Sequence, residues 1–176
     1  MSTTSFKLNA AKFHLNRIIN LRKTWKTILN PKARFKADVA VDGFLCEIMS
    51  TVDSLLHDVN DGLKLGIPTN EVKLRRVQRE MHVAGFNVAD LGDLNNLYST
   101  NHWLSDLREF RNHSVHQRLL GMVITLNLPA GATKAYLPKP WIAGGRTKKE
   151  VISYLRDQLR NVRNLVKDVK KRLQIQ

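Results

Sequence analysis

The chain has 176 residues, of which 43% are hydrophobic and 25% charged, a balance typical of one folded globular domain and not of a disordered or collagen-like chain. Its one cysteine, Cys46, excludes a disulfide framework and any zinc or iron–sulfur site built from several cysteines. The 29 Lys and Arg residues against 15 Asp and Glu give a formal net charge of +14, which predicts a polyanionic partner such as nucleic acid or an acidic membrane surface.

The sequence gives no sign of membrane insertion or secretion. No apolar run approaches the roughly 18 residues that a transmembrane helix needs. The first thirty residues carry Lys and Arg throughout and lack the apolar core and cleavage site of a secretory signal. With one cysteine that we expect to stay reduced, the sequence favours a cytoplasmic protein with no membrane partner.

Hydrophobic residues repeat with helical spacing over most of the chain. The spacing predicts four helices before the period changes, over about residues 8–29, 31–62, 70–84 and 101–120. Residues 63–69 are expected to form a turn. Residues 86–100 mix Asn, Asp and Gly with a few apolar residues, and we expect a loop that includes a short helical turn.

After the fourth predicted helix the pattern becomes extended. Residues 122–128 and 134–137 predict two short strands joined by a turn at Pro129-Ala130-Gly131, within an insertion over 122–140. Gly144-Gly145 then leads into a last helix, which has an apolar seam in steps of four and three. The seam consists of Val151, Leu155, Leu159, Val162, Val166, Val169 and Leu173.

Together these elements predict a single domain over residues 1–176. We expect an all-α fold, an antiparallel bundle of four to five helices with a short β-hairpin insertion. Charge is uneven along this bundle: residues 1–36 carry +9, residues 37–63 carry −6, residues 64–138 carry +3 and residues 139–176 carry +8. The surplus therefore lies on the two terminal helices, which we expect to be neighbours.

Basic residues on the last helix follow members of its apolar seam by one position, so they flank the packed face. They are Arg156, Arg160, Arg163, Lys167 and Lys170. Such a row can bind successive phosphates of an RNA strand. It can also be a solvated helix face whose long aliphatic stems cover the seam.

The segment most informative about chemistry is residues 104–116, which contains Arg111-Asn112-x-x-x-His116. Arg111 follows Leu107 by four residues and therefore lies on or beside the buried face, where a guanidinium needs a partner or a cleft. Asn112 precedes His116 by four residues, close enough for its amide to orient the imidazole. Arg111 and His116 are five residues apart, about 140° around a helix axis. Either the helix is distorted there or two copies of the motif meet across an interface.

The motif resembles the signature of the HEPN family, small helical bundles in which an Arg, often followed by Asn, precedes a His by four to six residues. The resemblance covers the motif helix closely and the rest of the chain as architecture. It implies a homodimer with a composite cleft and metal-independent cleavage of RNA. It also implies a toxin or host-defence role, with a cognate antitoxin protein as partner.

These residue types suit RNA cleavage without a metal or cofactor. His116 can accept the proton of a ribose 2′-hydroxyl or donate one to the leaving oxygen. Arg111 can stabilise the crowded phosphate, with Asn112 positioning the imidazole and Arg108 contacting RNA beside them. Attack by the 2′-hydroxyl would leave a cyclic phosphate and spare DNA.

The residues also allow two other interpretations. In the first, Arg111 pairs with a carboxylate of the acidic second helix, Glu47 or Asp53, and His116 is a surface histidine. In the second, the chain is a non-catalytic module that binds nucleic acid or protein through the same bundle and its basic ends.

Overall fold

The computed structural model describes residues 2–22, 31–116, 122–127, 132–139, 142 and 144–175. Within these residues the fold is all-α, as the periodicity predicts, with one short hairpin. The elements in chain order are α1 (Thr3–Arg22), α2 (Pro31–Gly62), η2 (Thr69–Glu71), α3 (Leu74–Val83), η3 (Val88–Asn96), α4 (Trp103–His116), β1 (Val123–Asn127), β2 (Ala132–Tyr136) and α5 (Val151–Leu173); η2 and η3 are 3₁₀ segments.

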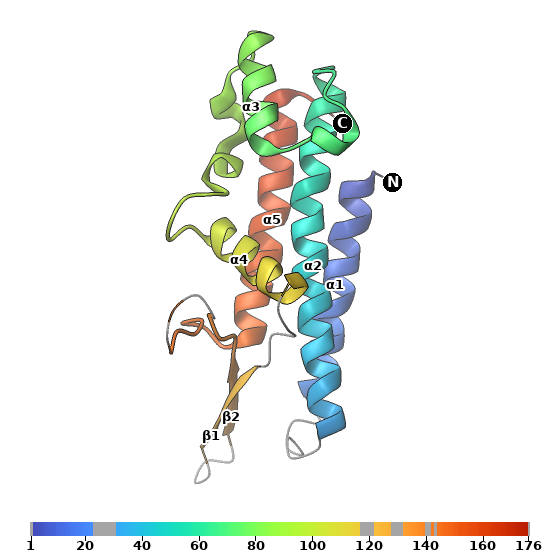
Figure 1. The fold of residues 1–176 in the computed structure, drawn as a ribbon. Helices are drawn as coiled ribbons and strands as arrows, with labels where there is room; N and C mark the ends of the chain where they lie inside the picture. The colour runs from blue at the N-terminus through green and yellow to red at the C-terminus, as the bar shows by residue number, and fades with distance from the viewer. Residues whose placement is uncertain are drawn as a thin grey trace.

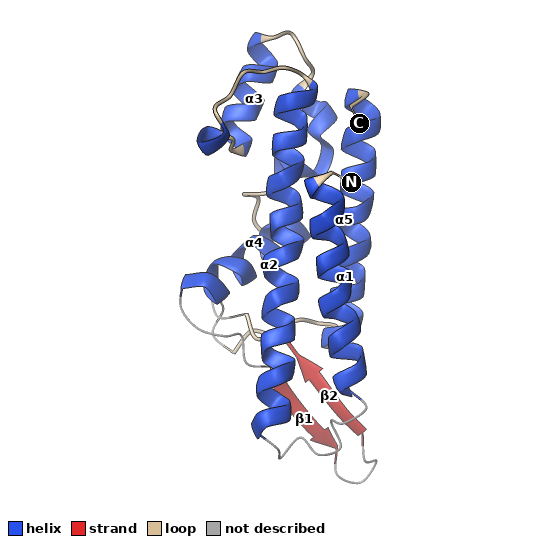
Figure 2. Cartoon of the chain, turned by 90° about the vertical axis from the view of Figure 1, so that its right-hand side faces the viewer, coloured by secondary structure: helices blue, strands red, loops and turns tan. Residues whose placement is uncertain are grey.

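Three long helices, α1, α2 and α5, form the body of the bundle (Figure 1). Helix α1 runs antiparallel to the other two, and the chain termini lie toward the same end of the molecule. The shorter α4 packs on α2, and the hairpin lies at the end far from the termini (Figure 2). Helices α1 and α5 contact each other, as the charge distribution led us to expect, and Arg22 pairs with Glu150 at 3.5 Å.

The core centres on α2, where a stripe of apolar residues at helical spacing is buried throughout. The fully buried members are Val41, Leu45, Ile48, Val52, Leu55 and Val59. Burial of each such side chain stabilises the fold by about 1.5–3 kcal/mol relative to leaving it exposed. Helix α1 approaches α2 closely at Gly43, where a Cβ atom would lie 2.5 Å from the His14 ring. The close approach explains why glycine suits this position in the middle of a helix.

The acidic side chains of α2 hold the neighbouring helices. Lys7 of α1 pairs with Glu47 at 3.1 Å, and Lys170 of α5 pairs with Asp58 at 2.8 Å. The hydroxyl of Thr4 also donates to Asp58, at 2.7 Å. Part of the charge of the basic terminal helices is therefore neutralised inside the fold, and the rest lies on outer faces.

Two segments differ from the sequence prediction. The third helix begins at Leu74, four residues later than expected, because Val72 (ψ 100°) and Lys73 (ψ 152°) are extended between η2 and α3. The extended pair places Leu74 so that it can be buried in the core. Residues 88–96 form a 3₁₀ segment longer than the expected helical turn, and it bends at Gly92 (φ 55°, ψ −128°).

The second helix has the predicted bounds, and the others shift modestly. Helix α1 begins at Thr3, and the expected continuation over residues 23–29 lies outside the described residues. Helix α4 begins at Trp103, because Asn101 has a left-handed backbone (φ 60°), and residues 117–120 again lie outside the described residues.

The last helix buries a wider face than its predicted seam. Gln158 and Leu165 are buried, whereas Val166 and Leu173 are only half-buried. At Leu165 the reason is that η3 packs along α5 and covers a second side of the helix. Strands β1 and β2 pair antiparallel, as predicted, with Thr125 opposite Lys134. None of the described helices is both long enough and apolar enough to cross a membrane.

Candidate functional site

The motif helix α4 is fixed to the bundle by its apolar side. Leu104, Leu107 and Phe110 are fully buried, and the helix packs on α2. Arg111 and Asn112 come directly after this anchor and are half-buried. Arg111 therefore lies at the border between the core and solvent, as its spacing from Leu107 predicts, and Asn112 lies next to it in the same kind of position.

Polar contacts join the end of α4 to α2 around Arg111. The Ser114 hydroxyl donates to the carboxylate of Asp42. Burial raises the pKa of the nearby Cys46 thiol and Asp42 acts in the same direction, whereas the Ser114 hydrogen bond and the Arg111 charge lower it. Arg111 thus lies within electrostatic reach of the acidic face of α2.

The carboxylate partner expected for Arg111 in the alternative interpretation is not formed. Within the described residues Arg111 makes no ion pair, and Glu47 pairs with Lys7 instead. The Asp53 side chain is partly open to solvent. Partial desolvation by the surrounding protein raises the pKa of Asp53, and the positive charge of Arg111 acts in the opposite direction. Asp53 is therefore a neighbour of Arg111 and not a bonded partner.

The motif spans one continuous helix. Helix α4 is α-helical from Trp103 to His116, its last residue. The positions of Arg111 and His116 are thus about 140° apart around the axis. A distorted helix, one of the two explanations left open by the sequence, is not present in α4. The side chain of His116 lies outside the described part of the chain.

Arg108, the other basic residue of α4, is held by its neighbours. Its guanidinium lies 4.7 Å from the centre of the Tyr98 ring and pairs with Glu109. A cation over an aromatic ring is stabilised by about 0.5–1 kcal/mol or more. The expected contact of Arg108 with RNA would have to compete with these two interactions.

The basic residues of α5 differ in exposure and in whether they form ion pairs. The exposed members of the predicted row are Arg156, Arg160, Arg163 and Lys167. Arg160 pairs with Asp157 at 2.6 Å, and Lys170 faces the interior, where it pairs with Asp58. We name Arg156, Arg160, Arg163 and Lys167 the α5 stripe. Eleven residues separate its ends, about 16 Å along the helix.

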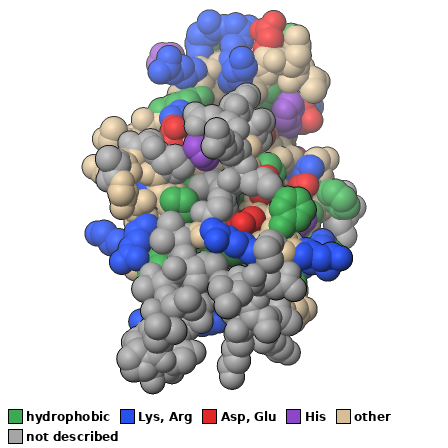
Figure 3. Space-filling model, turned by 60° about the horizontal axis from the view of Figure 1, so that its bottom comes forward, with side chains coloured by type: hydrophobic (Ala, Val, Ile, Leu, Met, Phe, Trp, Pro, Cys, Tyr) green, Lys and Arg blue, Asp and Glu red, His purple; other side chains and the backbone are tan. Residues whose placement is uncertain are grey.

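Lys and Arg side chains do not form a uniform coat. On the face drawn in Figure 3, those of the described residues gather in several separate groups. The groups alternate with acidic, apolar and other polar side chains. The net charge of +14 thus resolves into local patches, of which the α5 stripe is one.

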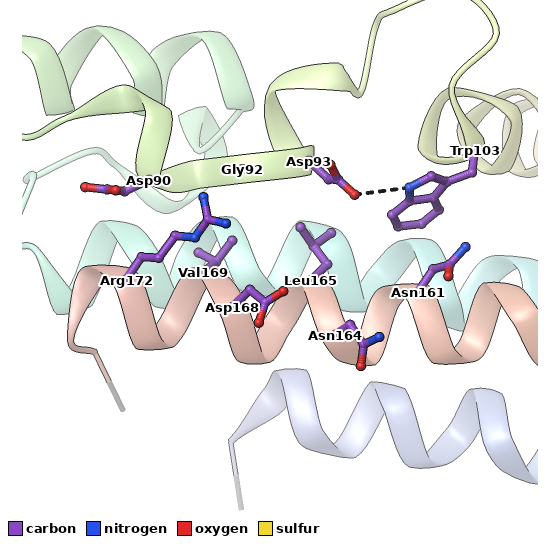
Figure 4. Close-up of a pocket in the computed structure, with 10 residues that line it drawn as sticks. All are labelled: Asp90, Gly92, Asp93, Trp103, Asn161, Asn164, Leu165, Asp168, Val169 and Arg172. Atoms are coloured by element: carbon purple, nitrogen blue, oxygen red, sulfur yellow. Dashed lines mark hydrogen bonds between the residues drawn. The ribbon is translucent and has the colours of Figure 1, made fainter.

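Two hollows lie along another side of α5, and both include Asn161. The smaller, of about 440 Å³, lies between η3 and α5 (Figure 4). Arg172 and Asp168 project into it from α5, and Asp93 accepts the indole N–H of Trp103 across 3.2 Å. Asp90, Asp93 and Asp168 line this hollow with three carboxylates, against the one guanidinium of Arg172. The lining is therefore acidic and unsuited to a phosphate.

The larger hollow, of about 700 Å³, lies between α5, residues before and within α4, and the segment after the hairpin. Tyr154, Gln158 and Asn161 line it from α5 at helical spacing. None of these residues was singled out from the sequence. The one available signal was Gln158, a polar residue whose position borders the apolar seam. Within the described residues, no group of three or more His, Cys, Asp or Glu side chains is arranged to hold a metal ion.

Comparison of the chain with protein-family models, with curated proteins and with solved structures finds no match. The resemblance to HEPN proteins therefore rests on the Arg111-Asn112-x-x-x-His116 motif together with the helical bundle that carries it.

Proposed function

We propose that this protein binds RNA and cleaves it without a metal ion, at a site that two chains of a homodimer form together. His116 acts as the acid or base at the ribose 2′-hydroxyl and the leaving oxygen, Arg111 stabilises the phosphate, and Asn112 positions the imidazole. The proposal includes a toxin or host-defence role in the cytoplasm, with a cognate antitoxin, which the HEPN resemblance alone supports.

The observation that carries the proposal is the state of Arg111. Its side chain is half-buried at the edge of the core, and it makes no ion pair within the described residues. A guanidinium without a carboxylate partner is suited to phosphate, because its planar fork matches two phosphate oxygens. The charge of neighbouring Asp53 keeps this cation compatible with partial burial.

Helix geometry supports the proposal of a dimer. Arg111 and His116 are five residues apart on a continuous α-helix, so their positions diverge around the axis. A two-fold dimer brings residue i of one chain to residue j of the other at two equivalent places. Arg111 of one chain and His116 of its partner can then meet the same phosphate.

The test compares RNA and DNA of equal sequence in the presence of a chelator. Cleavage of RNA alone is expected, and Arg111→Ala and His116→Ala should each lower its rate by about 10²-fold or more. Arg79→Ala and His82→Ala, at exposed positions of α3, are matched controls and should cleave at the wild-type rate. Equal cleavage by all four variants would refute the proposal.

RNA binding without cleavage is the second candidate function, and the exposed α5 stripe favours it. In that case RNA binds with a steep dependence on salt, and no product forms over long incubation. Binding of this kind, unaffected by Arg111→Ala and His116→Ala, would replace the cleavage proposal with a binding module.

A further inference from the structure

One outer side of the helical bundle carries exposed apolar side chains. Helix α2 lies between α1 and α4, which pack on opposite sides of it, and α5 also contacts it (Figure 2). The buried residues of α2 point toward these neighbours, so the remaining side of α2 faces outward. This outward side carries Phe35 and Val39, which lie one helical turn apart and are 58% and 37% exposed.

Helix α1 continues this apolar side. Lys7 and His14 of α1 point toward α2. Phe6 and Phe13 each precede one of these residues by one position, about 100° around the helix axis, and are 60% and 63% exposed. The buried Ala11 lies on the other flank of the contact with α2, so both rings lie on the outward flank. We name the surface formed by Phe6, Phe13, Phe35 and Val39 the α1–α2 face.

The α1–α2 face is large for an apolar surface in water. Four of the eight large hydrophobic side chains that are exposed within the described residues belong to it. Its three phenylalanine rings are each more than half exposed, and at about 200 Å² per side chain they leave roughly 350 Å² of apolar surface accessible to water. Apolar patches of some hundreds of Å² on a soluble domain mark interaction surfaces.

Charged side chains divide the same side of the molecule into two ends. Lys36 lies near the start of α2, and Arg17 of the antiparallel α1 lies toward the same end of the molecule (Figure 1). Asp53 and Asp61 lie toward the other end of α2. All four side chains reach solvent, and they make no ion pair within the described residues. The outward side is therefore basic at one end and acidic at the other.

This division of charge is self-complementary under a two-fold rotation. The two-fold axis of a dimer lies in the interface, so it runs either along the helices or across them. An axis along the helices brings the basic ends of both chains together, which is repulsive. An axis across the helices makes α2 of one chain antiparallel to α2 of its partner. The basic end with Lys36 then faces the partner's acidic end with Asp61.

The same antiparallel arrangement brings the aromatic residues together. Lys7 and His14 meet α2 on either side of the level of Cys46. Phe6 and Phe13, each one position earlier on α1, therefore lie about the same level. A two-fold axis across the helices at this level places Phe6 of one chain opposite Phe13 of its partner. Rings of both chains are then removed from water, the main favourable contribution to association.

The motif helix ends beside this level of α2. The charge of Arg111 acts on the pKa of both Cys46 and Asp53, so Arg111 lies within electrostatic reach of the outward side of α2. The Ser114 hydroxyl of the same helix donates to Asp42 of α2. An axis that runs across α1 and α2 continues toward α4, so the α4 helices of the two chains lie next to each other. A composite site requires this meeting of two motif helices.

We propose that the α1–α2 face is the interface of a homodimer, in which α1 and α2 of one chain pack antiparallel on the same helices of the partner. The inference rests on the proposed function, which requires a second copy of the chain, and it adds the surface through which the two copies meet. Three features favour a second copy as the occupant: the self-complementary charge, the match of Phe6 with Phe13, and the position of Arg111 beside the face.

The test measures the molar mass of the full chain without RNA, by size-exclusion chromatography with light scattering over a range of concentrations. The wild type should have twice the mass of one chain, and Phe13→Asp should weaken the dimer by about 30-fold or more. Val83→Asp, at an exposed apolar position of α3, is the matched control and should dimerise as the wild type does. If Phe13→Asp does not fold, as judged by thermal unfolding, Phe6→Asp replaces it. A monomeric wild type, or equal dimerisation of the folded face variant, overturns the proposal.

A charge exchange tests the antiparallel arrangement. Lys36→Glu and Asp61→Lys should each weaken the dimer by about fivefold or more at low salt, because each places like charges opposite one another. The variant with both changes restores opposite charges across the interface and should dimerise nearly as the wild type does. No recovery in the double variant overturns the antiparallel arrangement.

The results for the interface and for RNA cleavage are separable, because dimerisation is measured without RNA. A dimer that Phe13→Asp dissociates but that cleaves no RNA supports the interface and refutes the cleavage proposal. Cleavage by a dimer that Phe13→Asp leaves intact supports the proposed function and overturns this interface.

Discussion

The α5 stripe provides a quantitative prediction about RNA binding. Arg156, Arg163 and Lys167 are exposed and make no ion pair within the described residues, so each is available to a phosphate. Each contact with single-stranded RNA contributes about 0.7 to the slope of log affinity against log salt. Replacing all three by Gln should therefore make the slope shallower by about 2.

The assay is fluorescence anisotropy of a labelled single-stranded RNA, titrated at several salt concentrations between about 50 and 200 mM. The matched control replaces Lys64, Lys73 and Arg79 by Gln, which removes the same charge from exposed positions outside α5. We expect the control to keep nearly the wild-type slope. Equal losses of slope in both triple variants would show that net charge, and not the stripe, binds RNA.

Two further predictions concern the fold that presents the site. Gly43→Ala places a Cβ 2.5 Å from the His14 ring, so the ring must shift, and this cost opposes the roughly 1 kcal/mol that Ala gains over Gly inside a helix. Gly43→Ala should therefore stabilise a His14→Ala protein more than the wild type in urea unfolding; an equal effect in both would contradict the close approach of α1 and α2. Asp38 accepts the Met122 N–H at 3.1 Å, and burial raises the pKa of its carboxyl group. The folded protein therefore binds the Asp38 proton more tightly than the unfolded chain does. The stability that this proton contributes is lost as pH rises through the raised pKa. Asp38→Asn should remove that loss, so the variant gains stability relative to wild type as pH rises above 3.8, the ordinary aspartate pKa; parallel pH profiles would refute this.

Prediction from the sequence is most accurate where the buried face of a single helix determines the structure. The apolar residues of α2 have a strict helical period, and the predicted bounds of the helix, residues 31–62, are those observed. The placement of Arg111 beside the core follows from its distance to Leu107 in the same way. A local period suffices for both because each depends on a single helix face.

Features that depend on packing between distant segments could not be predicted from the sequence, because a local pattern does not specify which segments meet. Gln158 is buried beside residues of α4 and of the segment after the hairpin, and no pattern in the sequence predicts that these segments meet. The larger hollow beside α5 brings Lys139 next to Tyr154 only through the tertiary fold. The partner of Glu47 was equally hidden: Arg111 and Lys7 are both basic, and only the packing of α1 on α2 selects Lys7.

The central claim is that Arg111 of one chain and His116 of its partner share a site, and mixing two inactive variants tests it directly. Arg111→Ala and His116→Ala chains are mixed in equal amounts and allowed to exchange subunits, and RNA cleavage is measured. Random exchange makes about half of the dimers mixed, each with one intact site of two, so about a quarter of wild-type activity should return. No recovery above either variant alone, with exchange verified, would contradict the account.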